Sequence, residues 1–179
     1  FKRLSAAKKK YDLPAVACTF EPHPVRLLNP QKGLKLIYSY EQRYELIEQC
    51  EPDALVILDF SHELARTPAQ DFVKKVLVDL LHIKMIVVGY DFNFGKGGDG
   101  NAEALARFGE LYGFEVEQVP AVERDGRIVS SSRIRRLIGA GEMEMVRWML
   151  GRPFYLKGSV VEGKKRGGKL LGFPTANLS

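Results

Sequence analysis

The stretch SSSRIRRLI places three hydroxyl side chains directly before a cluster of arginines. Ser130, Ser131 and Ser132 open a helix-like run, and Arg135 lies within its first turns. Backbone N–H groups at a helix start, the helix dipole and guanidinium groups all attract an anion. Capping the helix needs only one of the three hydroxyls. The pattern therefore predicts a phosphate-binding site, with a capped helix and solvated arginines as the alternative.

Two further polar segments follow apolar, strand-like runs. TFEPHP (19–24) ends the run that begins at residue 15, and GYDFNFG (89–95) ends the run that begins at residue 85. In open α/β sheets, ligands bind at the carboxyl ends of the strands. Phe92 and Phe94 would form an aromatic wall for a flat ring, with Asp91 as a polar contact. Ordinary core packing of one of the two rings is the alternative.

The glycines of GKGGDG (95–100) formally match the pattern GxGxxG between a strand and a helix. This pattern invites a dinucleotide-binding interpretation, and an NAD-dependent oxidoreductase rests on this match alone. However, residues 90–94 separate the first glycine from the strand. The acids that could reach a ribose, Glu115 and Glu117, lie at the start of the next strand and not at its end. A mobile loop explains the glycines equally well.

The last segment, GKKRGGKLLGFPTAN (163–177), combines a glycine-rich cationic loop with an apolar turn. Flexible glycine backbone and lysines can close over a phosphate. Thr175 and Asn177 carry oxygen atoms of the kind that Mg²⁺ accepts as ligands. From the residues alone, a basic hairpin remains the simpler interpretation of this segment.

The charge of the chain is concentrated towards its end. Residues 127–179 hold eleven Lys or Arg against three Glu, a net charge of +8, whereas the whole chain carries +5. Such a basic region favours a phosphorylated small molecule or a nucleic acid as ligand. Aromatic residues are not interleaved with the Lys and Arg clusters, which argues against nucleic acid. No apolar run reaches the roughly 18 residues that a membrane span requires, and Cys18 and Cys50 lack metal or redox spacing, so we expect a cytoplasmic protein.

Strand-like and helix-like runs alternate over residues 1–150, which predicts an α/β domain with a mainly parallel, Rossmann-like sheet. The predicted strands cover residues 15–20, 53–60, 85–92 and 115–122. Near residue 150 the alternation stops, and FYLKGSVVEG (154–163) alternates like the first strand of a β domain. We therefore predict two domains, residues 1–150 and residues 151–179.

The starts of two predicted helices carry capping signals. Ser39 and Gln42 have the spacing of a capping box before a helix. The same logic applies to residues 67–83. It predicts Thr67 as N-cap, Pro68 as the first helical residue, and Gln70 as the capping-box partner of Thr67. The apolar face predicted for this second helix consists of Phe72, Val73, Val76, Leu80 and Leu81.

Four segments in this order resemble one family, the bifunctional bacterial riboflavin kinase/FMN adenylyltransferases, also called FAD synthetases. They are TFEPHP, VGYDFNFG, VSSSRIRRLIGAGE and MLGRPFYLKGSVVEGKKRGGKLLGFPTANL. The resemblance extends over all 179 residues and is most specific in GFPTAN. It implies a nucleotidyltransferase domain that transfers AMP from ATP to FMN, giving FAD and pyrophosphate. It also implies a β-barrel kinase domain that phosphorylates riboflavin to FMN, and small-molecule partners rather than nucleic acid or membrane.

The resemblance implies roles for residues in both domains. A flavin-side loop matches Phe20, Pro22, His23 and Pro24, and a second ligand loop matches Gly89, Asp91, Phe92, Phe94 and Gly95, with Gly89 beside ATP. The motif that holds the ATP phosphates and assists transfer matches Ser130, Ser131, Ser132 and Arg135. In the kinase part, the loop over ATP matches 163–169, including Gly163, Gly167 and Lys169, and the Mg²⁺ ligands match Thr175 and Asn177.

Two parts of the family pattern are absent from these residues. The family has an HxGH motif just after its first strand, and no HxGH occurs in this sequence. The kinase part includes the first strand and the PTAN turn but not the carboxylate that the family uses as base. We therefore expect the chain to be incomplete at both ends and to catalyse neither step well by itself. A non-catalytic flavin-binding or nucleotide-binding fragment is the alternative.

Overall fold

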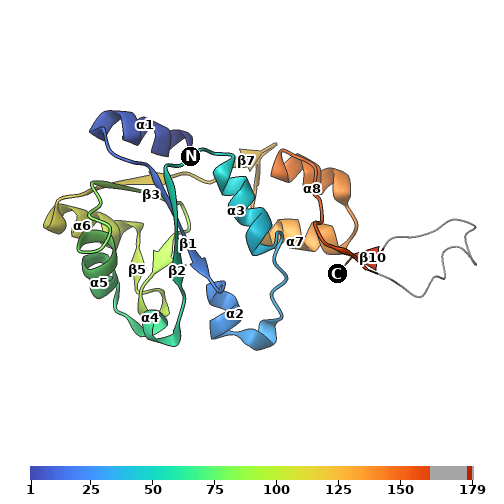
Figure 1. Cartoon of the computed structure of the whole chain (residues 1–179), viewed down its shortest axis with the longest axis horizontal. Helices are drawn as coiled ribbons and strands as arrows, with labels where there is room; N and C mark the ends of the chain where they lie inside the picture. The colour runs from blue at the N-terminus through green and yellow to red at the C-terminus, as the bar shows by residue number, and fades with distance from the viewer. Residues whose placement is uncertain (162–176, 179) are drawn as a thin grey trace, which may run out of the picture.

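The computed structural model describes residues 1–161 and 177–178. Two parallel strand pairs form its centre (Figure 1): β1 (Val16–Glu21) pairs with β2 (Ala54–Asp59), and β3 (Met85–Gly89) pairs with β6 (Glu115–Val119). Parallel strands need long connections, and both connections here contain helices. The predicted parallel α/β architecture is confirmed, although no ladder among the described residues joins the two pairs into one sheet.

Three short antiparallel pairs complete the strands. β4 (Asn93–Phe94) pairs with β5 (Gly100–Asn101), and β7 (Glu123–Arg124) pairs with β8 (Arg127–Ile128) around a turn at Asp125 and Gly126. β9 (Val160–Val161) pairs with β10 (Asn177–Leu178). The strand predicted from residue 154 is therefore wrong in its first half, because residues 153–159 form no ladder.

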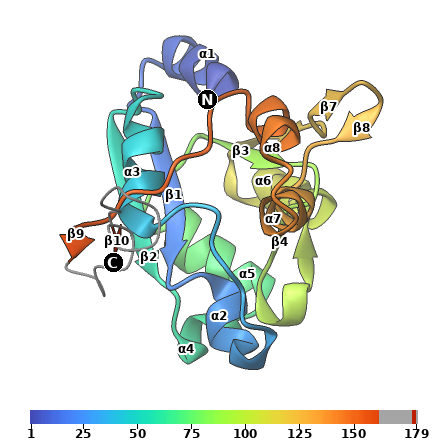
Figure 2. The ribbon, with the colours of Figure 1, turned by 90° about the vertical axis from the view of Figure 1, so that its right-hand side faces the viewer.

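Helices fill the connections and both ends of the described chain. They are α1 (Lys2–Tyr11), α2 (Pro24–Leu28), α3 (Tyr40–Glu48), α4 (His62–Arg66), α5 (Ala69–Phe72), α6 (Ala102–Tyr112), α7 (Ser131–Gly139) and α8 (Met143–Leu150), with 3₁₀ turns η1 (Pro30–Lys32) and η3 (Lys96–Gly98) and a π-helical turn η2 (Val73–Val78). In Figures 1 and 2, α1 lies at one end of the molecule and α2 and α4 at the other. Because β1 follows α1 and precedes α2, the carboxyl end of β1 points to the end with α2.

Several helix boundaries follow from local sequence as predicted. Ser39 and Gln42 form the capping box of α3, with reciprocal side-chain bonds to each other's backbone N–H. α6 ends at Gly113 and α8 at Gly151, both left-handed with φ of 78° and 71°. Glycine reaches this conformation without the steric penalty of a Cβ atom, so it ends a helix efficiently.

The predicted cap at Thr67 is wrong. The Thr67 side chain donates a hydrogen bond to the Glu63 carbonyl (3.1 Å) and so belongs to the end of α4, a short helix that Ser61 caps. Pro68 has ψ of 152°, outside the helical range, so Pro68 and not Thr67 occupies the N-cap position of α5. The next helix therefore begins only at Ala69.

The predicted apolar face of residues 67–83 is also partly wrong. Leu80 is 63% exposed, whereas Leu77 is 5% exposed and belongs to the core. The reason is the π-helical turn over Val73–Val78, in which the Asp79 N–H bonds to the Lys74 carbonyl at 2.8 Å. Such an i→i+5 turn widens the helix, so a face extrapolated with the α-helical period fails beyond it.

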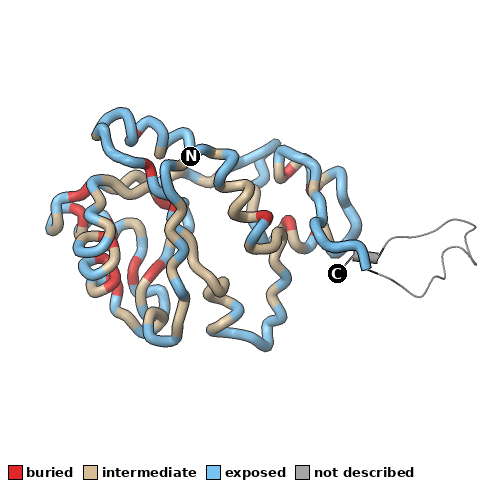
Figure 3. Tube along the Cα trace, in the orientation of Figure 1, coloured by how far each residue is buried: buried red, intermediate tan, exposed pale blue. Residues whose placement is uncertain are grey.

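Buried side chains form two clusters (Figure 3). The larger one surrounds β3, α5 and α6, and its most buried members are Val73 and Leu105. The smaller one lies between α7 and α8 around Ile134 and Val146, with Ile37 and Phe154 packed against it. The second cluster thus connects α7 to segments before α3 and after α8.

The segment after α8 is docked on α3. The Gln42 side chain is 3% exposed and donates to the Tyr155 carbonyl at 3.2 Å. The Tyr38 ring lies 5.9 Å from those of Phe154 and Tyr155, and Lys157 forms an ion pair with Glu45. Residues 154–157 are therefore held against α3 by both polar and aromatic contacts.

We predict that Gln42→Ala destabilises the fold by about 1–3 kcal/mol, because it leaves the Ser39 N–H and the Tyr155 carbonyl without their partner. Urea unfolding measures the change. The control is Gln70→Ala, which removes an exposed side-chain contact with Tyr112 and should cost less than about 0.5 kcal/mol. Equal losses in the two variants would contradict a special role for the buried amide.

Candidate functional site

The EPHP segment joins the carboxyl end of β1 to α2. Phe20 and Glu21 are the last residues of β1, and Pro24 is the first residue of α2. His23 caps α2: its Nδ1 accepts the Val25 N–H at 3.2 Å. The backbone N–H of His23 donates to the Tyr40 hydroxyl at 2.9 Å. His23 therefore shapes this loop through contacts with both α2 and α3.

The serine and arginine segment forms the start of α7. Ser130 is the N-cap, and its hydroxyl accepts the Arg133 N–H at 3.4 Å. Ser131 and Ser132 are exposed, and in the described part of the chain their hydroxyls have no hydrogen-bond partner. Arg135 donates from Nε to the Lys35 carbonyl at 2.8 Å, which ties α7 to the linker before α3. One hydroxyl thus caps the helix, and two remain available for a ligand.

Positive charge from three helices converges on His23. Burial lowers the pKa of His23, and the charges of Arg135, Arg43 and Arg26 lower it further. Arg26 lies on α2, Arg43 on α3 and Arg135 on α7. Fixed like charges near one neutral imidazole mark a place where an anion is favoured. The structure therefore brings the predicted EPHP loop and the predicted phosphate helix together.

Arg26 and Arg43 were not singled out by the sequence analysis. Each uses part of its guanidinium on a backbone carbonyl, Arg26 on Leu34 (3.4 Å) and Arg43 on Phe20 (3.1 Å). The signal that could have found Arg43 is its place in α3, the longer helix of the crossover between β1 and β2, because elements that are close in sequence are often adjacent in space.

The aromatic residues of the two predicted flavin loops form a row of rings. Phe92 stacks on Phe94 at 5.4 Å, Phe94 contacts Phe72 at 5.9 Å, and Phe72 contacts Phe20 at 6.4 Å. Phe94 is 8% exposed and belongs to the core, whereas Phe92 and Phe20 are half-buried. Phe94 thus follows the core-packing alternative, and a ligand can reach Phe92 and Phe20 more readily.

Gly89 and Asp91 lie at the carboxyl end of β3. Gly89 is the last residue of that strand, and its carbonyl accepts the Phe92 N–H at 3.2 Å in a tight turn. Asp91 is exposed, and its carbonyl accepts from the Asn93 side chain at 2.9 Å. The Asp91 carboxylate is therefore open to solvent beside the half-buried Phe92.

The GxGxxG match has a structural explanation. Gly95 has φ of 76°, and a Cβ atom there would lie 2.8 Å from the Ala69 backbone, so only glycine fits. Gly97 and Gly98 also have positive φ, in the turn between β4 and β5. α6 begins only after this hairpin, with Asn101 as its cap. The glycines therefore build a hairpin and do not open a helix as a dinucleotide site requires.

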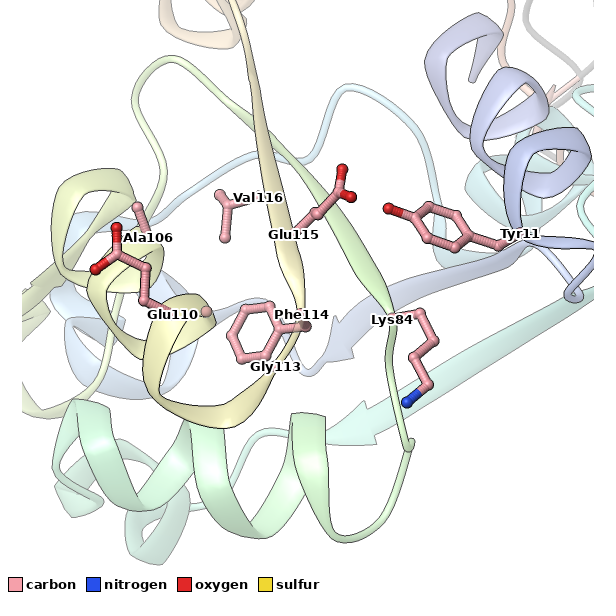
Figure 4. A pocket seen from close by; sticks show the side chains of 9 residues that line it. Tyr11, Lys84, Ala106, Glu110, Gly113, Phe114, Glu115 and Val116 are labelled. Atoms are coloured by element: carbon pink, nitrogen blue, oxygen red, sulfur yellow. The ribbon is translucent and has the colours of Figure 1, made fainter.

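A pocket of about 570 Å³ lies at the opposite end of the strands (Figure 4). Its lining includes Tyr11, Lys84, Glu110 and Glu115. Glu115 begins β6 and Lys84 immediately precedes β3, so the pocket is at the amino ends of both strands. It shares no residue with the predicted ligand loops, and we do not assign the substrates to it.

The predicted kinase residues are mostly not part of the described structure. Gly163, Gly167, Lys169 and Thr175 lie outside the described residues. The Asn177 backbone belongs to β10 and pairs with Val161. Among the described residues, no helix is both long and apolar enough to cross a membrane.

Comparison with known proteins identifies the family. The FAD synthetase family model matches residues 1–133. The chain belongs to this family. The riboflavin kinase family model matches residues 150–179, so segments of both kinds follow each other in one FAD synthetase chain.

Several curated relatives of this FAD synthetase chain carry the name bifunctional riboflavin kinase/FMN adenylyltransferase. The protein of Listeria monocytogenes is 36% identical, covering 93% of this chain and 52% of the relative. The protein of Buchnera aphidicola from Schizaphis graminum is 34% identical (96% and 55%), and that of Escherichia coli K12 is 31% identical (95% and 54%). The chain thus spans about half the length of the curated relatives it matches.

One solved structure has the same fold over nearly the whole chain. It is a crystal structure described as a macrolide-efflux protein from Streptococcus pneumoniae, with a TM-score of 0.78 and 32% identity. The match covers 98% of this chain and 56% of that one. The word efflux describes the Streptococcus pneumoniae protein and is not applied to this chain.

We predict that inorganic pyrophosphate raises the pKa of His23, because a bound anion offsets the nearby arginine charges that lower it. NMR titration of the imidazole with and without pyrophosphate measures this shift. The signals of the exposed His62 and His82, which lie outside this loop, serve as internal references in the same spectra. An unchanged His23 titration at saturating pyrophosphate would show that no anion binds here.

Proposed function

We propose that this chain acts in FAD biosynthesis, with residues 1–150 serving FMN adenylylation and residues 151–179 serving riboflavin phosphorylation. The observation that carries the first part is the convergence of His23 and Arg135. An electropositive site between an aromatic loop and a serine-rich helix start suits FMN together with ATP. The family membership and the names of the relatives support both parts.

In the proposed adenylyl transfer, the FMN phosphate attacks the α-phosphorus of ATP in line, and pyrophosphate leaves. No covalent enzyme intermediate is needed, so the chain's residues position the reactants and stabilise charge. Arg135, Ser131 and Ser132 would hold the departing pyrophosphate, with Ser130 fixing the helix start and Gly89 lying beside ATP. The free hydroxyls and exposed helix start support this assignment.

The flavin would bind between the two loops that follow β1 and β3. Phe20 and Phe92 offer half-buried ring surfaces, and Asp91 offers an exposed carboxylate. Pro22, His23 and Pro24 would form the rigid side of the site. Phe94 would support Phe92 from the core, since the two rings stack.

For the kinase step, Thr175 and Asn177 would bind Mg²⁺, and the loop with Gly163, Gly167 and Lys169 would cover the ATP phosphates. Mg²⁺ would supply charge neutralisation on the transferred phosphate. This part of the proposal rests on the riboflavin kinase match over residues 150–179. A cytoplasmic location fits these soluble substrates.

A first strand with its HxGH motif is part of the proposed adenylyltransferase domain. Among the described residues β1 pairs only with β2, and β3 pairs only with β6, so each has one open edge. A strand between β1 and β3 would pair with both edges and join the two ladders into one parallel sheet. This placement would bring the motif to the carboxyl ends of the strands, beside the EPHP loop.

The proposal is tested by chromatographic detection of FAD after incubation with FMN, ATP and Mg²⁺. We expect slow FAD formation by the 179-residue chain. A chimera in which the corresponding N-terminal segment of the Listeria relative precedes this chain should form FAD much faster. A folded chimera that binds FMN but makes no FAD would contradict the proposed transfer.

We predict that Arg135→Met lowers the affinity for ATP at least tenfold, because a charge-assisted contact to phosphate contributes roughly 1.5–3 kcal/mol. Isothermal titration of the chain with ATP and Mg²⁺ measures the affinity. Arg136→Met is the matched control. Arg136 is exposed on the same helix, and its substitution removes the same charge. Equal losses in both variants would indicate a general charge effect and contradict a specific contact.

A further inference from the structure

Three side chains of α3 form hydrogen bonds with the segment from Phe20 to His23. Two of them bond to its backbone, and the third bonds to the Glu21 carboxylate. The Tyr40 hydroxyl accepts the His23 N–H at 2.9 Å. Arg43 donates from Nη2 to the Phe20 carbonyl at 3.1 Å. Tyr44 donates its hydroxyl proton to the Glu21 carboxylate. Side chains of one helix therefore contact three of the four residues from Phe20 to His23.

The spacing of these side chains makes them a single unit. Positions i, i+3 and i+4 lie on one face of an α-helix. The Arg43 guanidinium lies 5.0 Å from the Tyr40 ring centre and 5.6 Å from the Tyr44 ring centre, so both rings restrict it. Its Nε is buried and has no hydrogen-bond partner among the described residues. The three side chains support one another as well as the loop.

The protonation state of Tyr44 suits this contact. Burial and the hydrogen bond to Glu21 raise the pKa of Tyr44, so the phenol keeps its proton at neutral pH. It therefore remains a hydrogen-bond donor to Glu21. The contact keeps this acid directed towards α3.

α3 is itself fixed at its start and along another part of its surface. Its capping box closes the first turn, and the buried Gln42 side chain continues to the Tyr155 carbonyl. A helix anchored in this way can impose a position on a loop that contains two prolines and few backbone hydrogen bonds.

We propose that Tyr40, Arg43 and Tyr44 are positioning residues for the flavin site, which hold the Phe20–Pro24 loop in its binding geometry. The inference rests on the proposed function, because it takes this loop as part of the flavin site. A loop that is already ordered does not lose conformational freedom on binding, so the affinity for FMN depends on these three contacts. They touch the loop and not the reacting atoms.

The first variant is Tyr40→Phe, which removes only the oxygen that accepts the His23 N–H. Pro22 and Pro24 have no amide hydrogen, so His23 carries the only one within residues 22–24. NMR hydrogen exchange of this amide reports the contact without any flavin. We expect exchange to become at least fivefold faster, as loss of one hydrogen bond of roughly 1 kcal/mol implies.

The second measurement is FMN affinity of the complete chain, from the change of flavin fluorescence. We expect the Kd for FMN to rise about five- to tenfold in Tyr40→Phe and more in Arg43→Met, with Arg43→Lys partly restoring it. The Kd for ATP should stay within twofold in Tyr40→Phe. Glu48→Gln is the control, because Glu48 is exposed at the end of the same helix, and both Kd values should be unchanged.

The outcomes separate the two levels of the proposal. Unchanged His23 exchange in Tyr40→Phe, or faster exchange with an unchanged Kd for FMN, would overturn the positioning role while the proposed function stands. If the wild-type chain and the chimera both fold but neither binds FMN, the proposed function is contradicted. The flavin-positioning role is then contradicted as well. Loss of thermal stability together with equal losses of ATP and FMN affinity would indicate a structural role and also overturn the proposal.

Discussion

The candidate site depends on parallel strand pairing. In a parallel pair both chains leave the sheet at the same edge, and each must return through a crossover. In this chain that constraint sends β1 into the EPHP segment and β3 into the GYDFNFG segment. The crossover between β1 and β2 then supplies α3, whose side chains contact the first of these segments.

A second constraint is the electrostatic repulsion between like charges that lie close together. Arg26, Arg43 and Arg135 all lie close enough to His23 to oppose its protonation. Each guanidinium is held by a carbonyl, which fixes its direction and satisfies some of its donors. An anion bound among the three guanidinium groups would offset their effect on His23. This is the behaviour that a phosphate-binding site needs, because its donors must be in place before the ligand arrives.

α3 connects this site to the segment that leads into the riboflavin kinase match. One set of its side chains contacts the EPHP loop, and Gln42 and Glu45 contact residues 155 and 157. The same helix therefore contributes to both parts of the chain. Its capping box is local, but its function as a connector depends on contacts with residues more than 100 positions away.

The sequence by itself determined the features that depend on neighbouring residues. The capping box of α3, the glycine ends of α6 and α8, the hairpin turn at Gly126 and the serine start of α7 were all predictable. The family resemblance was predictable as well, because its motifs are contiguous. These features need only short-range backbone and side-chain geometry.

Tertiary structure alone decided which distant groups meet and which side chains are buried. Three features depend on how separate elements pack. They are the proximity of Arg135 to His23, the hydrogen bonds from Tyr40 and Arg43 to the loop, and the burial of Phe94. The prediction for Thr67 was wrong because the backbone of Pro68 is not helical, and the prediction for Leu80 was wrong because a π-helical turn precedes it. Periodicity describes one element at a time, whereas burial and charge convergence are properties of the contacts between elements.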